Sequence, residues 1–547
     1  MTKEKFLNKI KENKSFLITV AICLLIMFLC SFSQIIFNFW VNKDDLVFHA
    51  ARIGGIAEAI LSGQFPIKYY SSWIYGGGYF GSIFYGDFFL IFPALLVVCG
   101  LPLKVSYTIF TYTIYILFFV CMYFFSKKYL KSKNLSAICA GIFCISQYVF
   151  SNFFRRGAVG EIIAIIFVFV FLLAIYNMLN ENYSKPWLFS VAFMGLLLSH
   201  MTLLIVCAIV LVGVVIFNCK KLFNNKKFWI KSLFALGIFV LVGLYSLSSF
   251  VELYFSDTYK ISQPWTYPSE NVHNLYDMLG NSKYAIGFLL LSAFVLRFFI
   301  KKTEENKEEI KIADNFLILS GIILFFVSSL FPWQLFDKIF SFLQFPWRLN
   351  TFAAIYLSIT LVLLLKNLKS INTLKVKIIC SCVVFAAVVY NNLYVSRLYS
   401  STKEFNYSTN ICFEWTPMGI DLELLKQKQV VNENGDAVEY NRKENSVDID
   451  FSVSEDSNYY ITPLIYYKGY DAYLIDENGK KTDVDVNKDS ETGLVKVETN
   501  GEVGKVYLYY AGTTIQNVTF PISFGASCLF IIGGIVYFIV KKKKQKN

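Results

Sequence analysis

Long apolar runs recur along almost the whole chain, and each is close to the roughly 20 residues that a helix needs to cross a bilayer. In lipid, such runs must be helical, because a helix satisfies its own backbone hydrogen bonds. Only 16% of residues are charged, against about 25% in soluble domains, which excludes an ordinary soluble protein. We predict an all-α polytopic membrane protein with about twelve spans, at residues 15–40, 105–125, 135–151, 159–179, 187–199, 202–218, 229–253, 284–300, 313–331, 349–366, 374–395 and 523–540.

Lysine clusters between these runs indicate the orientation, because positive residues gather in cytoplasmic loops. Both termini are therefore predicted to be cytoplasmic. The pattern also explains the net charge of +12 without a nucleic-acid partner, for which the chain has no motif. All of these lysine clusters lie on the cytoplasmic side only if the run at 84–103, which has Pro93 in its middle, does not cross the membrane. We expect it to form a re-entrant or interfacial segment of the first outer loop (41–104), beside a polar cavity.

Residues 396–522 have a different pattern from the rest of the chain. Val447–Phe451 alternates with period two, Val506–Tyr510 is strand-like, and Asp476–Gly479 is typical of a hairpin turn. We predict a small extracellular β-rich domain, in the form of a sandwich, following a transmembrane domain at 1–395. A C-terminal helix and a basic cytoplasmic tail complete the chain at 523–547.

Two adjacent carboxylates, Asp44 and Asp45, follow directly after the first span. A charge near a membrane costs several kcal/mol if it enters hydrocarbon, so such residues are usually retained for chemistry or for binding a polar group. Helical spacing would place Asp45, His49 and Arg52 on one face. The alternative is that the acid pair caps the following helix, since Asp is a favoured N-cap residue.

Further ionisable residues are expected at the outer ends of spans. Arginine binds phosphate bidentately, and a nearby carboxylate can accept a proton from an attacking hydroxyl group. Together they fit transfer from a phosphate-linked lipid to an acceptor outside the cell. The alternatives are snorkelling arginines, paired structural acids and a histidine satisfied within a helix break. The further ionisable residues to which both interpretations apply are Arg155, Arg156, Glu161, His200, Glu252 and Arg348.

The order of these features resembles the GT-C superfamily of polyprenol-dependent membrane glycosyltransferases. An outer acid pair is followed by a loop containing Gly63-Gln64-Phe65-Pro66, a re-entrant segment and an acid in the second outer loop. More narrowly, several short motifs resemble bacterial YfhO-like membrane proteins and their pyruvoyl-tetrahydropterin-synthase-related relatives. They are Asp45–His49 with Arg52, Arg156-Gly157-Ala158 with Glu161, Ser199-His200, Phe345–Arg348, and Pro463–Tyr470 followed by Asp476–Lys480.

This resemblance implies inverting transfer of a sugar from a polyprenyl-phosphate donor at the outer leaflet of a bacterial cell membrane. The acceptor would be a cell-wall polymer such as a teichoic acid, or a glycolipid. Asp44 or Asp45 would be the base, with Asp45 preferred because its helix face includes His49. Glu161 would be an acceptor or geometry group, and Arg348 and Arg156 would hold the donor phosphate. The family implies no metal and no cofactor.

Two other functions are compatible with the sequence. A transporter or lipid flippase for envelope precursors would be expected to spread polar residues through its spans, whereas the ionisable residues here gather at one face. A noncatalytic assembly protein would instead use the region at 396–522 to bind polymer.

Overall fold

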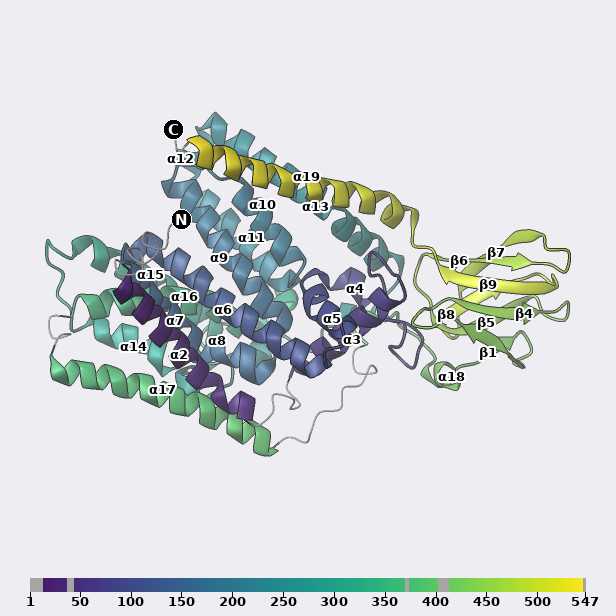
Figure 1. Ribbon diagram of the computed structural model, residues 1–547, viewed down its shortest axis with the longest axis horizontal. Helices are drawn as coiled ribbons and strands as arrows, with labels where there is room; N and C mark the ends of the chain where they lie inside the picture. The colour runs from purple at the N-terminus through teal and green to yellow at the C-terminus, as the bar shows by residue number, and fades with distance from the viewer. Residues whose placement is uncertain (1–12, 37–43, 369–372, 402–412, 545–547) are drawn as a thin grey trace, which may run out of the picture. The chain divides into compact units, whose positions relative to one another are not determined.

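The computed structural model describes residues 13–36, 44–368, 373–401 and 413–544, and it is mostly helical with a C-terminal β domain (Figure 1). The N-terminal residues 1–12, predicted to be cytoplasmic, and the end of the first predicted span, 37–40, fall outside the described residues. The chain forms two compact units, each assembled from three segments. The first contains residues 1–49, 107–173 and 264–406, and the second contains residues 50–106, 174–263 and 407–547.

Among the described residues, eight helices are long and apolar enough to cross a membrane. A ninth candidate is a bent pair, in which α7 (Lys133–Ile145) meets the segment Gln147–Arg156 at 53°. The prediction of about twelve spans therefore exceeds the number of helices that qualify. The eight lie in α2 (Lys14–Ile36), α6 (Leu103–Leu130), α9 (Val159–Asn180), α13 (Lys226–Ser256), α15 (Lys307–Val327), α16 (Asn350–Lys366) with the turn Pro346–Leu349 before it, α17 (Leu374–Ser401) and α19 (Thr514–Lys544).

The other predicted runs form α10 (Trp187–Leu197), α11 (Met201–Phe217) and α14 (Phe288–Arg297), which are shorter. At about 1.5 Å per residue, α10 and α14 rise roughly half of the 30 Å hydrocarbon core. Apolar composition continues past the ends of these helices, so it overestimates their length. The run at 284–300, for example, includes Gly287, whose positive φ of 89° precedes the first turn of α14.

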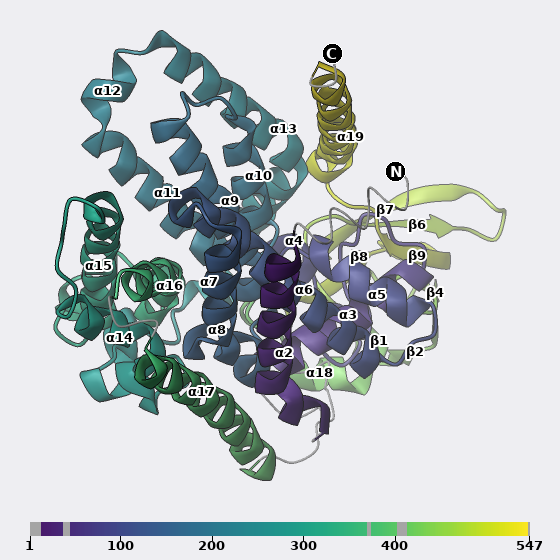
Figure 2. The same ribbon diagram turned by 60° about the vertical axis from the view of Figure 1, so that its left-hand side comes forward.

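The core of the first unit is built around α16. Every residue from Asn350 to Leu364 is buried except Tyr356, which fits a helix that is apolar on all sides. Helices α14, α15 and α7 pack against it, and α2 packs against α7 and α17 (Figure 2). Short helical turns complete the unit: η4 (Pro268–Asn271), η5 (Asp277–Asn281), η6 (Trp333–Leu335), η7 (Ser341–Leu343) and η8 (Pro346–Leu349).

In the second unit, α13 and α19 lie side by side, and α10 packs against α13. Residues 84–103 contain α5 (Ile91–Val98), which rises only about 12 Å and is too short to cross a membrane. The remaining helices here are α3 (Leu46–Leu61, mostly in this unit), α4 (Gly81–Phe84), η1 (Phe88–Leu90), α12 (Cys219–Phe223), η3 (Lys260–Ser262) and α18 (Leu422–Gln427).

The described part of the β domain has nine strands in the order β2-β1-β5-β8-β7-β6-β9-β4-β3. Strand β7 pairs with β6 through its first half and with β8 through its second, so it joins the two halves of the sheet. These halves contact each other through the rings of Phe451 and Tyr460, 5.5 Å apart. The strands are β1 (Val430–Asn432), β2 (Ala437–Val438), β3 (Tyr440–Arg442), β4 (Ile449–Val453), β5 (Tyr459–Ile465), β6 (Tyr470–Ile475), β7 (Lys481–Lys488), β8 (Leu494–Glu498) and β9 (Gly504–Tyr510).

The β-rich prediction is confirmed in its main features. The alternating segment forms β4, the strand-like segment forms β9, and Asp476–Gly479 forms the turn between β6 and β7. In that turn the N–H of Gly479 donates to the carbonyl of Asp476 at 3.0 Å. Helix α19 begins at Thr514, well before residue 523, because the hydroxyl of Thr513 accepts a hydrogen bond from the N–H of Gln516.

Candidate functional site

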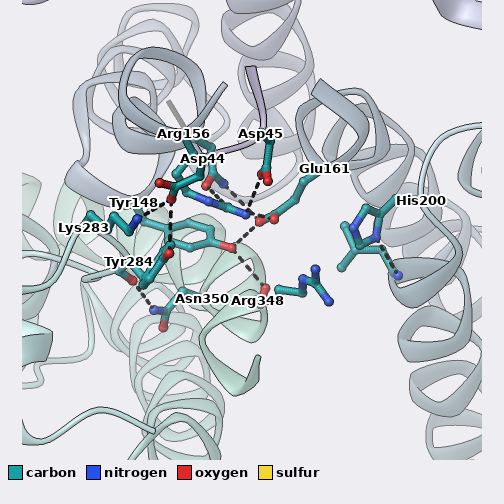
Figure 3. Close-up of polar contacts among 12 residues, drawn as sticks. Asp44, Asp45, Tyr148, Arg156, Glu161, His200, Lys283, Tyr284, Arg348 and Asn350 are labelled. Atoms are coloured by element: carbon teal, nitrogen blue, oxygen red, sulfur yellow. Dashed lines mark hydrogen bonds and ion pairs between the residues drawn. The ribbon is translucent and has the colours of Figure 1, made fainter. Parts of the chain in front are cut away.

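Arg156 lies at the centre of a polar cluster in the first unit (Figure 3). Its Nη1 donates to Oδ1 of Asn152 at 2.6 Å and to Oε2 of Glu161 at 2.9 Å. Its Nη2 lies 3.3 Å from Oδ2 of Asp45. The side chains of Arg156 and Glu161 are 5% and 2% exposed, so this ion pair is buried. A buried pair of this kind holds its members in fixed positions, because either charge alone would be costly to bury.

The local backbone explains how Arg156 reaches these partners. Residues Asn152–Arg156 form a π turn (η2) after α8 (Gln147–Ser151), and Gly157 ends it in the left-handed conformation, with φ 67°. π turns occur frequently at functional sites. Glycine adopts positive φ without a steric penalty. The same turn presents the carbonyl of Arg156 to the N–H of Asp45, which donates to it at 3.0 Å.

Glu161 is fully engaged by its neighbours. Besides the bond from Arg156, its Oε1 accepts from the hydroxyl of Tyr148 at 2.5 Å and from Nδ2 of Asn152 at 3.1 Å. The Tyr148 hydroxyl also lies 3.4 Å from the carbonyl of Arg348. This burial and bonding suit Glu161 to orienting Arg156.

Asp45 remains accessible at the edge of this cluster. Its side chain is 40% exposed, and its carbonyl accepts from the N–H of His49 in the first turn of α3. Partial withdrawal from solvent raises the pKa of Asp45, which Arg156 opposes and the neighbouring carboxylates Asp44 and Glu161 reinforce. A carboxylate with a raised pKa is a stronger base, and this one remains open to solvent on one side.

Asp44 belongs to a second group of contacts. Its Oδ2 pairs with the ammonium of Lys283 and accepts from the hydroxyl of Tyr284 at 3.2 Å. The Tyr284 ring stacks on Trp347 at 3.9 Å and 4°. The guanidinium carbon of Arg156 lies 4.5 Å from the centroid of the Trp347 ring, so the stack connects the two groups of contacts through cation–π interactions.

Two other arginines lie near the acid pair, and both are half-buried. Arg348 donates through Nη1 to the carbonyl of Leu343 at 2.9 Å and interacts electrostatically with Asp45. Arg155 interacts in the same way with Asp44. These guanidiniums are the more accessible ones beside the carboxylates, since Arg156 is enclosed by its own partners.

Seven of the ten predicted site residues therefore belong to the first unit: Asp44, Asp45, His49, Arg155, Arg156, Glu161 and Arg348. His49 is buried one turn after Asp45. The other three, Arg52, His200 and Glu252, belong to the second unit.

Within the second unit, each of these three residues has polar partners of its own. Arg52 donates to Asp87 at 2.5 and 3.1 Å and is 2% exposed. The Nδ1 of His200 accepts from the N–H of Leu203 at 3.3 Å, which caps α11. Glu252 lies 3.0 Å from Nζ of Lys468 and accepts from the hydroxyl of Thr513, so it joins α13 to the β domain and to the start of α19.

Sequence reasoning missed Tyr148, Asn152, Lys283 and Tyr284. Lys283 carried a usable signal, because a lysine in a segment predicted to be outside opposes the orientation bias just as Arg155 and Arg156 do. The tyrosines gave none, since aromatic residues are common in the apolar runs. In the part of the chain that the structure describes, no group of three or more His, Cys, Asp or Glu residues is placed to hold a metal ion.

Comparison with protein-family models and with curated proteins finds no match for this chain.

Proposed function

We propose that the protein is a membrane glycosyltransferase of the GT-C type, related to the YfhO-like proteins. It transfers a sugar from a polyprenyl-phosphate donor to an extracellular acceptor, which is a cell-wall polymer or a glycolipid. The observation that carries this proposal is the accessible acid pair Asp44 and Asp45, backed by the buried pair of Arg156 and Glu161. A base that is open to solvent and held by buried charges is what proton abstraction from an acceptor hydroxyl requires.

In the proposed reaction, the Asp45 carboxylate takes the proton of the acceptor hydroxyl. The oxygen attacks the anomeric carbon of the donor sugar, and the bond from that carbon to the phosphate oxygen breaks. The polyprenyl phosphate leaves with the electron pair, and the configuration inverts because attack and departure occur on opposite faces. Arg348, Arg155 and Lys283 neutralise the phosphate, while Arg156 and Glu161 hold Asp45 in place.

The proposed topology puts this cluster outside a bacterial cell membrane, with both termini in the cytoplasm. The bent pair and the shorter helices α10, α11 and α14 then count as membrane segments alongside the eight longer ones. The α5 segment lies in the first outer loop as a re-entrant or interfacial element, and the β domain is extracellular. The clusters of lysine that follow α6, α11 and α16 support this orientation.

A direct test uses purified protein in nanodiscs with a radiolabelled polyprenyl-phosphate sugar and an envelope fraction as acceptor. Asp45→Asn and Asp44→Asn should fold normally and lower sugar incorporation by at least about 100-fold for the residue that is the base. Asp277→Asn is the matched control, because this acid lies in the same unit and bonds within its own turn. Normal incorporation in the double variant Asp44→Asn/Asp45→Asn contradicts the proposal.

A lipid flippase is the second candidate, and the bent pair at Gln147–Arg156 favours it, since broken helices often form substrate sites in transporters. Measuring translocation of the same labelled lipid in vesicles separates the two functions. A flippase moves the donor without an acceptor and without releasing free polyprenyl phosphate.

A further inference from the structure

A polar groove of about 560 Å³ opens on the β domain, where β3 and β4 face the residues between α18 and β1. This volume is within the roughly 300–1,000 Å³ of small-ligand sites in proteins. The residues that line it and bear on its chemistry are Lys428, Tyr440, Asn441, Asp450, Ser452 and Lys505.

Three of these side chains form a fixed hydrogen-bonding group. Asp450 accepts from Nδ2 of Asn441 at 3.0 Å, and its Oδ1 lies 2.5 Å from Nζ of Lys505. An amide, a carboxylate and an ammonium therefore lie together at the groove and keep further donor and acceptor capacity. Vicinal hydroxyl groups are recognised by closely spaced donors and acceptors of this kind.

The groove continues onto an aromatic row on the outer face of the sheet. The strand register aligns Asn441 and Asp450 with Tyr507, Tyr473 and Asp483 across β3, β4, β9, β6 and β7. The Tyr507 and Tyr473 rings lie 5.2 Å apart at 17°, and both are half-buried. Aromatic rings next to polar groups offer an apolar surface to the C–H face of a sugar. Nζ of Lys481 lies 3.7 Å from the centroid of the Tyr473 ring and Nζ of Lys505 lies 5.3 Å from that of Tyr507, so Tyr507 is the less closely covered of the two rings.

The charges on this surface are nearly balanced. The described residues of the groove and the row include the cations Lys428, Lys481 and Lys505 and the anions Glu439, Asp450, Asp471 and Asp483. A surface that binds a polyanion would carry an excess of positive charge. This balance favours an uncharged ligand.

We propose that this groove and the adjoining tyrosine row bind a neutral glycan chain. Sugar hydroxyls bond to Asn441, Asp450 and Lys505, and sugar rings pack against Tyr507 and Tyr473. The proposal of glycan binding depends only on residues of the β domain. The further role of the bound glycan as acceptor rests on the proposed glycosyltransferase function.

The test measures binding of cellohexaose and chitohexaose to the full-length protein in nanodiscs by calorimetry, with poly(glycerol phosphate) as the polyanion. At least one hexasaccharide should bind, and Tyr507→Ala and Asp450→Ala should each weaken that binding about tenfold or more. Asp450→Asn keeps the shape of the side chain and should also weaken binding, which covers the case in which the alanine variant fails to fold.

Tyr459 and Lys496 provide matched controls on another part of the same domain. Nζ of Lys496 lies 4.2 Å from the Tyr459 ring and 3.2 Å from Oε1 of Glu498, so this site has a similar composition without the groove. Tyr459→Ala and Lys496→Ala should leave the affinity unchanged. The inference is overturned if neither hexasaccharide binds, if only the polyanion binds, or if the control variants weaken binding equally. If a hexasaccharide binds but the Asp44 and Asp45 variants still transfer sugar, the binding site stands and the proposed function fails.

Discussion

Asp45 and Arg156, 111 residues apart in the chain, are joined through both their backbones and their side chains. The N–H of Asp45 donates to the carbonyl of Arg156 at 3.0 Å, and Nη2 of Arg156 lies 3.3 Å from Oδ2 of Asp45. A change in the turn that contains Arg156 therefore changes the position of the carboxylate. In the proposed reaction this makes Arg156 a positioning residue for Asp45.

The first prediction concerns the buried pair of Arg156 and Glu161. Glu161→Gln leaves the guanidinium without its main counter-charge, so we expect a loss of about 3–5 kcal/mol in the free energy of unfolding. The double variant Arg156→Met/Glu161→Met removes both charges and should recover most of that loss, because a buried ion pair contributes little net stability. Chemical unfolding in detergent measures both values.

Sugar transfer by the same variants separates stability from positioning. Arg156→Met/Glu161→Met should remain inactive even when it is folded, since the Asp45 carboxylate then loses its contact with the Arg156 guanidinium. A stable double variant with full transfer activity would show that the pair has no part in the reaction.

The second prediction concerns Gly157. An alanine there must adopt a φ of 67°, and its Cβ would lie 3.0 Å from Cβ of Leu46, the residue next to Asp45. The positive φ costs about 1–2 kcal/mol by itself. Gly100→Ala is the control, because Gly100 has a φ of 92° but nothing within 4 Å of an added Cβ. We expect a loss of stability in both variants, larger in Gly157→Ala because the contact with Leu46 adds to the φ penalty, and a reduction of sugar transfer only in Gly157→Ala.

The charged members of the site were predictable from the sequence, whereas their contacts were not. Asp44, Asp45, Arg156 and Glu161 stood out because ionisable residues at the ends of apolar runs are costly and need a reason. The pairing of Asp44 with Lys283 joins residues 239 positions apart, and no local pattern indicates it. The same holds for the stacking of Tyr284 on Trp347, which is decided by the packing of the first unit.

The fold, like the site, was predictable from the sequence only in part. Apolar runs predicted where helices occur, because burial or lipid demands them, and period-two alternation predicted β4. Run length predicted α11 to within one residue at each end but overestimated α14, because the run at 284–300 includes apolar residues on both sides of that helix. Helix α19 begins before the predicted run at 523–540, because the Thr513 cap starts the helix in a less apolar segment.

The third prediction concerns Arg52, which was a substrate-binding candidate. Its guanidinium donates to Asp87 and to the carbonyls of Tyr85 and Gly86, and lysine cannot reproduce this planar set of bonds. We expect Arg52→Lys to lower the free energy of unfolding by about 3 kcal/mol or more. Arg297→Lys is the control, because Arg297 pairs with Asp314 where both side chains are about a third exposed, and such pairs contribute roughly 0–1 kcal/mol. Wild-type stability with lost transfer in Arg52→Lys would instead support a substrate-binding role.

The fourth prediction is a loss of stability in mild acid, caused by His273. This residue is 5% exposed, and burial lowers its pKa to about 4, an effect that Asp277 opposes. Because an unfolded histidine has a pKa near 6.5, the unfolded chain binds the proton more readily between pH 6.5 and 4. Stability is therefore complete above pH 6.5 and falls as the pH drops, by roughly 3 kcal/mol in total once the pH is below 4.

Unfolding curves measured across this range test the assignment to His273. His273→Gln keeps a polar group near Ser282, whose Oγ lies 3.2 Å from Nε2 of the histidine, and should remove the decline between pH 6.5 and 4. Asp277→Asn removes the charge that favours the protonated ring, so the pKa falls further and the decline extends to lower pH. A decline that persists unchanged in His273→Gln would assign the acid sensitivity to other groups.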